Sequence, residues 1–259
     1  MTAILQSRLP FAPWMSPVTA RLPGVQPVAG EDWLVVDEAY AGQMARRDAL
    51  IADQPEVVLG MRPEGAAAAT ELYEMVLARL RQQAGYRVGD SEVLRPDGRV
   101  VPLDPAAPLR TLGQLVQEDL CLLQRQGDEH VLTAACLCFP ASWSLAEKLG
   151  RPMTGIHRPV ASYDPDMARR VQRLFDALRP DLPLWRMNAL VYVDPELHQP
   201  RTEDAPRTDR RGGQYVRAER QTMLRLPQTG AALFAIHTYV VPLTALTEAE
   251  RAGLVAARL

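Results

Sequence analysis

The second half of the chain contains short apolar runs, several of which alternate with polar residues as half-buried β-strands do. These runs predict five strands, over Leu120–Arg125, His130–Phe139, Leu184–Val193, Tyr215–Leu226 and Ala231–Val241. A Gly127-Asp128 turn joins the first two strands, and the segment Pro227–Gly230 joins the last two. Between the second and third strands, helical spacing predicts helices over Trp143–Leu149 and Pro165–Leu178.

The first half of the chain is less regular. A Pro-rich stretch reaches to about Asp32, and we expect it to lie as an extended arm across another surface, because proline cannot donate to a β-ladder. Helical spacing predicts helices over Glu38–Ile51, Ala66–Ala84 and Pro108–Gln117. A final helix is expected from about Thr247 to Arg258, with Thr247 as N-cap and Glu250 at the capping-box position. Residues 1–110 should therefore pack as an arm and helices on a core formed by residues 111–259.

The order of these elements is that of a PAS domain: two hairpin-linked strands, a helical crossover and a three-strand meander. It predicts an α+β fold in which a five-stranded antiparallel sheet carries helices on one face and encloses a small-molecule pocket. A fold of this kind does not define a function, so the chemistry has to be inferred from individual residues.

Composition excludes several classes of protein. With 29 basic and 31 acidic residues the net charge is -2, which disfavours nucleic-acid binding driven by bulk charge. The N-terminus lacks the apolar core of a signal peptide, and no run approaches the roughly 18 apolar residues of a spanning helix. The 3 cysteines do not suggest a disulfide framework. We expect a cytoplasmic protein without nucleic-acid or membrane partners.

His157 is the histidine with the most suggestive setting. It lies between the two crossover helices, flanked by the apolar residues Met153, Ile156 and Val160. An imidazole held there can offer one nitrogen to iron while the other donates to a backbone carbonyl. No second His or Cys stands at a metal-ligand spacing, so a zinc site is not supported, whereas one protein ligand is enough for a haem. A hydrogen-bonded loop histidine without a metal is an equally good interpretation of these residues.

Two charged residues lie on apolar strand faces. Arg220 shares a face with Val216 and Leu224, whereas Arg217, Glu219, Gln221 and Arg225 point the other way. A guanidinium on an apolar face needs an anion, which a haem propionate or a buried carboxylate would supply. His237 shares a face with Leu233, Ala235 and Tyr239, where it is a core histidine or a pocket residue.

Three segments carry a resemblance to a known family. They are CFPASWSLAEKLGRPMTGIHRPVASY (138–163), LWRMNALVYVDPELHQP (184–200) and VRAERQTMLRLPQTGAALFAIHTYVVPL (216–243). Together with the opening LPFAPWMSPVTARLPG they resemble the haem-dependent oxidative N-demethylase alpha-subunit-like family over nearly the whole chain. The resemblance implies a PAS-type sheet that holds haem b.

The resemblance also implies an activity and partners. The family oxidises a small methylated amine with O2 and releases formaldehyde, using electrons from NADPH that arrive through flavin and iron–sulfur subunits. Nothing in this chain resembles a flavin, ferredoxin or folate module, so a reductase and a folate-dependent subunit would be separate proteins. Carried onto this sequence, His157 becomes the candidate iron ligand and Arg220 the candidate partner of a haem propionate. The candidates for the substrate pocket are Trp185, Tyr192, Tyr239 and His237.

Two alternatives stay open at this stage. The chain could be a haem-PAS sensor or ligand-binding module without turnover, although it contains no kinase, cyclase or DNA-binding segment that would receive a signal. It could also be a PAS-like assembly subunit that has lost haem.

Overall fold

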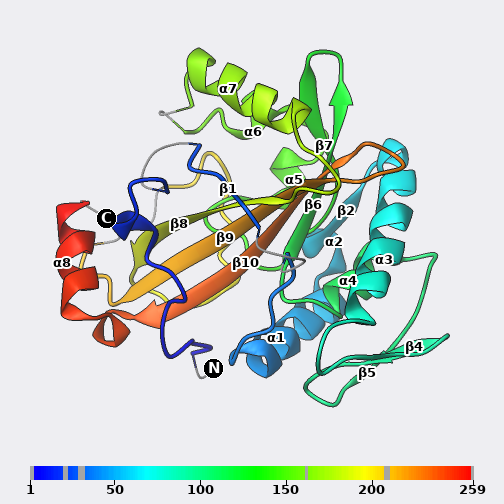
Figure 1. Cartoon of the computed structure of the whole chain (residues 1–259), viewed down its shortest axis with the longest axis horizontal. Coiled ribbons are helices and arrows are strands. Elements are labelled where there is room, and N and C mark those ends of the chain that lie inside the picture. Colours follow the sequence, from blue (N-terminus) through cyan, green and yellow to red (C-terminus); the bar gives the residue numbers. More distant parts are fainter. Residues whose placement is uncertain (1–2, 20–22, 29–32, 161–162, 207–210, 258–259) are drawn as a thin grey trace.

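The strands predicted from the apolar pattern form the centre of one large antiparallel sheet (Figure 1). The computed structural model of the chain describes residues 3–19, 23–28, 33–160, 163–206 and 211–257. In this part of the chain, the sheet has seven strands in the order β1-β8-β9-β10-β6-β7-β2. Its strands are β1 (Gln26–Pro27), β2 (Leu59–Met61), β6 (Asp119–Gln126), β7 (Glu129–Cys136), β8 (Leu184–Tyr192), β9 (Tyr215–Arg225) and β10 (Ala232–Pro242).

The sheet therefore has two strands more than the five that the sequence predicted. The additional strands come from the first half of the chain and pair with the two edges, Gln26 opposite Trp185 and Leu59 opposite Cys136. Segments of two or three residues are too short to show an alternating pattern, so the sequence gives no sign of them. They cover backbone groups that an open edge would leave unpaired.

The helices and the small second sheet complete the fold. The helices are α1 (Tyr40–Asp53), α2 (Pro55–Val58), α3 (Ala66–Leu80), α4 (Pro108–Gly113), α5 (Leu145–Lys148), α6 (Met153–Ile156), α7 (Pro165–Asp176) and α8 (Glu248–Ala256). Short 3-10 helices occupy Pro13–Met15, Pro63–Gly65 and Leu243–Ala245, and strands β3 (Arg87–Val88), β4 (Glu92–Leu94) and β5 (Val100–Pro102) form the second sheet. The capping box predicted at Thr247 and Glu250 is confirmed at the start of α8. Helix α6 was not expected.

Helices cover both faces of the large sheet, where the sequence predicted one (Figure 1). In β6, Leu120 and Leu122 pack into a cluster with residues of α1, α3 and α4. Their neighbours Cys121 and Leu123 belong to a second cluster, with Met153 and residues of α5 and α7. Because central strands such as β6 carry apolar side chains on both sides, each face needs a cover to exclude water.

The described residues of the N-terminal arm contact the large sheet and the last helix. The Gln6 backbone N–H donates to the Val240 carbonyl at 2.9 Å, and the Trp14 indole donates to the Glu250 carbonyl at 2.9 Å. The arm thus joins the first residues of the chain to β10 and α8. The predicted division at residue 110 falls inside α4, and one apolar cluster contains residues from both sides of it. That division stays a prediction.

None of the helices in the described part of the chain has both the length and the apolar character that crossing a bilayer requires.

Candidate functional site

His157 ends helix α6, at the start of the connection to α7. This short helix is held by the only lysine of the chain, Lys148, whose ammonium group donates to the Ile156 carbonyl at 2.8 Å. The same group forms an ion pair with Glu203 at 2.6 Å. These contacts fix the end of α6 and therefore the backbone from which the His157 ring projects.

The His157 ring has the protonation pattern of a metal ligand. Its Nδ1 lies 2.9 Å from the Met153 carbonyl oxygen, which can only accept, so Nδ1 carries the proton. Burial lowers the pKa of His157 below its usual value, which favours the neutral ring. The ring stacks on Tyr163 with 4.3 Å between centroids. Among the described residues, none is a hydrogen-bond partner of Nε2, whose lone pair is therefore available.

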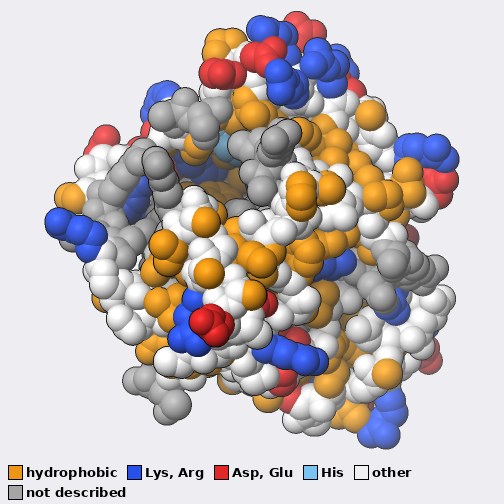
Figure 2. All heavy atoms as spheres, turned by 60° about the vertical axis from the view of Figure 1, so that its left-hand side comes forward, with side chains coloured by type: hydrophobic (Ala, Val, Ile, Leu, Met, Phe, Trp, Pro, Cys, Tyr) orange, Lys and Arg blue, Asp and Glu red, His pale blue; other side chains and the backbone are white. Residues whose placement is uncertain are grey.

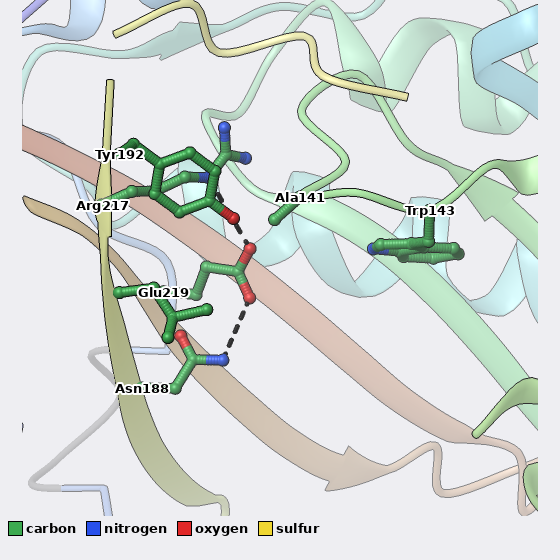
Figure 3. A pocket seen from close by; sticks show the side chains of 7 residues that line it. Ala141, Trp143, Asn188, Tyr192, Arg217 and Glu219 are labelled. Carbon is green, nitrogen blue, oxygen red and sulfur yellow. Dashed lines mark hydrogen bonds and ion pairs between the residues drawn. The ribbon is translucent and has the colours of Figure 1, made fainter. Parts of the chain in front are cut away.

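A pocket of about 370 Å³, partly open to solvent, lies on the face of the large sheet that helices α5–α7 cover, the face on which His157 lies (Figure 3). Its lining residues are Ala141, Trp143, Asn188, Leu190, Tyr192, Arg217 and Glu219. Strands β8 and β9 supply the polar side chains, and Trp143 stands across from them on the connection between β7 and α5 (Figure 3). A view from the side of α8 shows a hollow in the molecular surface, with basic side chains and a histidine in it (Figure 2).

The Glu219 carboxylate is the acidic group of this pocket. One of its oxygens accepts hydrogen bonds from the side-chain amides of Asn188, at 3.3 Å, and Gln221, at 3.1 Å. The other oxygen faces Arg217 Nε at 3.9 Å, which is an ion pair but too long for a hydrogen bond (Figure 3). The carboxylate is thus oriented by two amides and keeps acceptor capacity toward the pocket.

Arg217 stabilises the wall of the pocket that faces β8 and β9. Its terminal nitrogens donate to the Leu197 carbonyl at 2.8 Å and to the Phe139 carbonyl at 2.6 Å. Phe139 begins the segment that carries Ala141 and Trp143, so this arginine ties that wall to β9. Hydrogen bonds from a charged donor are among the stronger polar contacts in proteins.

The structure divides the residues predicted from the sequence between two faces of the sheet. Tyr192 lines the pocket on the His157 face. The other four, Arg220, Trp185, Tyr239 and His237, lie on the opposite face, where the arm and α8 pack. There the Arg220 guanidinium stands 5.5 Å above the Trp185 ring. The structure therefore does not bring Arg220 together with His157.

His237 is the centre of a buried charge cluster on that opposite face. Its Nδ1 lies 3.1 Å from Glu118 and its Nε2 lies 3.2 Å from Asp37. Burial disfavours the imidazolium, but the hydrogen bonds and charges of the two carboxylates outweigh burial and raise the pKa of His237 to about 9. His237 thus links β10 to Asp37, ahead of α1, and to Glu118, ahead of β6.

This cluster predicts a stability that falls in alkaline solution. An unfolded histidine titrates near pH 6.5, so between about pH 6.5 and 9 the folded chain holds a proton that the unfolded chain has lost. The stabilisation is fully present below pH 6.5 and is lost as the pH rises through about 9. Urea unfolding at pH 6.0 and 9.5 should show a larger loss for the wild type than for His237→Gln. Equal losses in the two proteins would contradict the assignment.

Sequence reasoning missed Asn188, Arg217 and Glu219. In β9 the signal was present as the second set of alternating positions, Arg217, Glu219, Gln221 and Arg225, which are polar and were expected to face away from the apolar residues. In the structure Arg217 and Glu219 are buried, at 3 % and 9 % exposure, because the connection between β7 and α5 covers them. The polar side chains on this face of β8 and β9 thus indicated a pocket rather than a solvent-exposed surface.

The fold defines an α+β protein in which the helical crossover that carries His157 and a polar pocket lie on the same face of the large sheet. No cluster of three or more His, Cys, Asp or Glu side chains in the described residues is arranged to hold a metal ion. Residues 24–259 match the family described as haem-dependent oxidative N-demethylase, alpha subunit-like, and the chain belongs to that family. The family's name connects it with haem-dependent oxidation and with enzymes built from several subunits.

Proposed function

We propose that this chain is the haem-binding subunit of an oxidative N-demethylase that acts on a small methylated amine. The observation that carries the proposal is the half-buried His157, with Nδ1 on a carbonyl and an available lone pair on Nε2. A haem needs only one such protein ligand, because the porphyrin supplies four nitrogens. The donor set of this face therefore fits haem b.

The PAS arrangement is part of the proposal. Five neighbouring strands of the sheet follow the order β8-β9-β10-β6-β7, with the helical crossover α5–α7 between β7 and β8. His157 belongs to that crossover, and the pocket lies between the crossover side and the sheet. We take β1 and β2 as additions to the edges of this five-strand unit.

The bound haem would supply the activation of O2. The balanced reaction removes one methyl group: the N-methylated amine, O2, two electrons and two protons give the amine with hydrogen in place of that methyl group, formaldehyde and water. The alpha-subunit description of the family supports separate redox partners, which we propose to be flavin and iron–sulfur subunits that carry electrons from NADPH, with a folate-dependent subunit as a further partner.

The residues of this chain hold the ligand and the substrate. His157 presents Nε2, and the Met153 carbonyl keeps the proton on Nδ1, which fixes the ring and makes it a better donor. Glu219 binds the ammonium form of the amine, and its two amide neighbours keep it oriented. The Trp143 ring, and Tyr192 beside Glu219, are surfaces on which methylated cations bind well (Figure 3).

The test has two stages. The purified chain, expressed with an iron source and a haem precursor, should show a Soret band that shifts on reduction with dithionite. With a surrogate reductant and O2, it should then release formaldehyde from dimethylamine in proportion to the amine consumed. A chain without a Soret band would exclude a haem function. A Soret band without formaldehyde from mono-, di- or trimethylamine would favour the sensor or ligand-binding module instead.

A further inference from the structure

Arg186 is the arginine that shares a sheet face with His157. Along β8, Trp185 and Met187 pack into the cluster on the opposite face, so Arg186 between them points toward the helical crossover. Its cross-strand neighbour is Gln221, whose side chain lies on the same face of β9 as Glu219. The positive charge of Arg186 is one of the influences that lower the pKa of His157, so the two groups lie within electrostatic reach.

Arg186 is half-buried, and its environment differs from that of the buried arginines Arg47 and Arg95. Arg47 forms an ion pair with Asp119 at 2.7 Å, and Arg95 forms one with Asp48 at 3.0 Å. Within the described residues, Arg186 makes no hydrogen bond or ion pair. Burial consequently lowers the pKa of Arg186, although a guanidinium stays charged at neutral pH.

Glu219 does not neutralise this charge by direct contact. Its charge acts on Arg186, but the side chains that it contacts are Asn188, Gln221 and Arg217. A half-buried guanidinium without a protein partner gains charge-assisted hydrogen bonds when an anion binds to it. Within the described residues, this face of the sheet therefore carries a positive group without a protein partner, on the same side as the proposed ligand of the iron.

We propose that Arg186 binds a carboxylate of the haem, the role that the sequence alone assigned to Arg220. The inference rests on the proposed haem function and adds a residue to its site. A planar guanidinium forms paired hydrogen bonds with a carboxylate, and such charge-assisted pairs are strong in buried surroundings. His157 and Arg186 lie on one face of the sheet, whereas Arg220 is separated from His157 by the sheet itself.

The test is a titration of the haem-free chain with haemin and with haemin dimethyl ester, whose two carboxylates are blocked. Arg186→Gln should weaken haemin binding about 10- to 100-fold, the range expected for hydrogen bonds to charged groups. The same substitution should change binding of the dimethyl ester by less than about 3-fold, since the ester offers no carboxylate to lose. Arg186→Lys should retain part of the affinity, and Arg220→Gln should behave as wild type.

The outcomes separate this inference from the proposed function. Equal weakening of haemin and the ester by Arg186→Gln would mean that Arg186 acts through packing and would overturn the inference. Wild-type affinity in Arg186→Gln would also overturn it, while leaving the haem function intact. A wild-type chain that binds neither compound would overturn both. Far-UV circular dichroism of each variant establishes that it is folded before titration.

Discussion

His157→Ala is expected to abolish the haem spectrum and, with it, formaldehyde release. The substitution removes the Nε2 donor of a ring whose Nδ1 is bound to a backbone carbonyl, Met153 O. Loss of the single protein–iron bond should weaken haem binding by several orders of magnitude. The measurement is the Soret absorbance after addition of one equivalent of haemin, followed by gel filtration to remove loosely held haem.

His198→Ala is the matched control. Its Nδ1 also lies 2.8 Å from a backbone carbonyl oxygen, that of Cys138, so the substitution removes a similar imidazole and a similar hydrogen bond. The control should retain the wild-type Soret band. Imidazole added to His157→Ala should restore part of the spectrum by entering the space left by the ring. A His157→Ala protein with unaltered ferric and ferrous spectra would refute the ligand assignment.

The central strands could be predicted because their side chains follow the period of the pleat. Strands β8, β9 and β10 are nine or eleven residues long, and each carries enough alternating positions to be identified from the sequence. The edge strands β1 and β2 are too short for any pattern. Their existence depends on where the first half of the chain packs, which is a tertiary property.

The site was predictable only in part, because the sequence does not show which helices and connections pack on each face of the sheet. His157 stood out by its place between helices. Arg220 stood out because it lies among apolar residues, yet those residues pack against Trp185 and the N-terminal arm. Arg186 and Glu219 lie on the polar face of the same strands, and only the fold shows that the helical crossover and its connection bury that face.

A second large effect is expected at Asp119, a buried carboxylate at the start of β6. It forms an ion pair with Arg47 at 2.7 Å, and the two side chains are only 1 % and 0 % exposed. It also accepts hydrogen bonds from the backbone N–H groups of Cys138, at 2.7 Å, and Phe139, at 2.9 Å. One side chain thus balances a buried charge and holds the segment whose Phe139 carbonyl binds Arg217 in the pocket wall.

Asp119→Ala should lower the free energy of unfolding by about 3–5 kcal/mol, because it leaves the Arg47 guanidinium buried without its counter-ion. The two freed backbone donors add to the cost and should loosen the pocket wall. Urea denaturation followed by circular dichroism measures the change in midpoint. Arg47→Met should cost less, since Asp119 would keep its two backbone donors.

Asp181→Ala supplies the control that separates burial from ion pairing. Asp181 pairs with Arg179 at 2.6 Å, as close as the Asp119–Arg47 contact, but both side chains are more than 60 % exposed. Solvent screens such a pair, so its removal should leave the urea midpoint unchanged within error. Similar midpoints for Asp119→Ala and Asp181→Ala would mean that the Asp119 pair does not support the fold. A large loss confined to Asp119→Ala would show that the buried carboxylate supports the fold where an exposed ion pair does not.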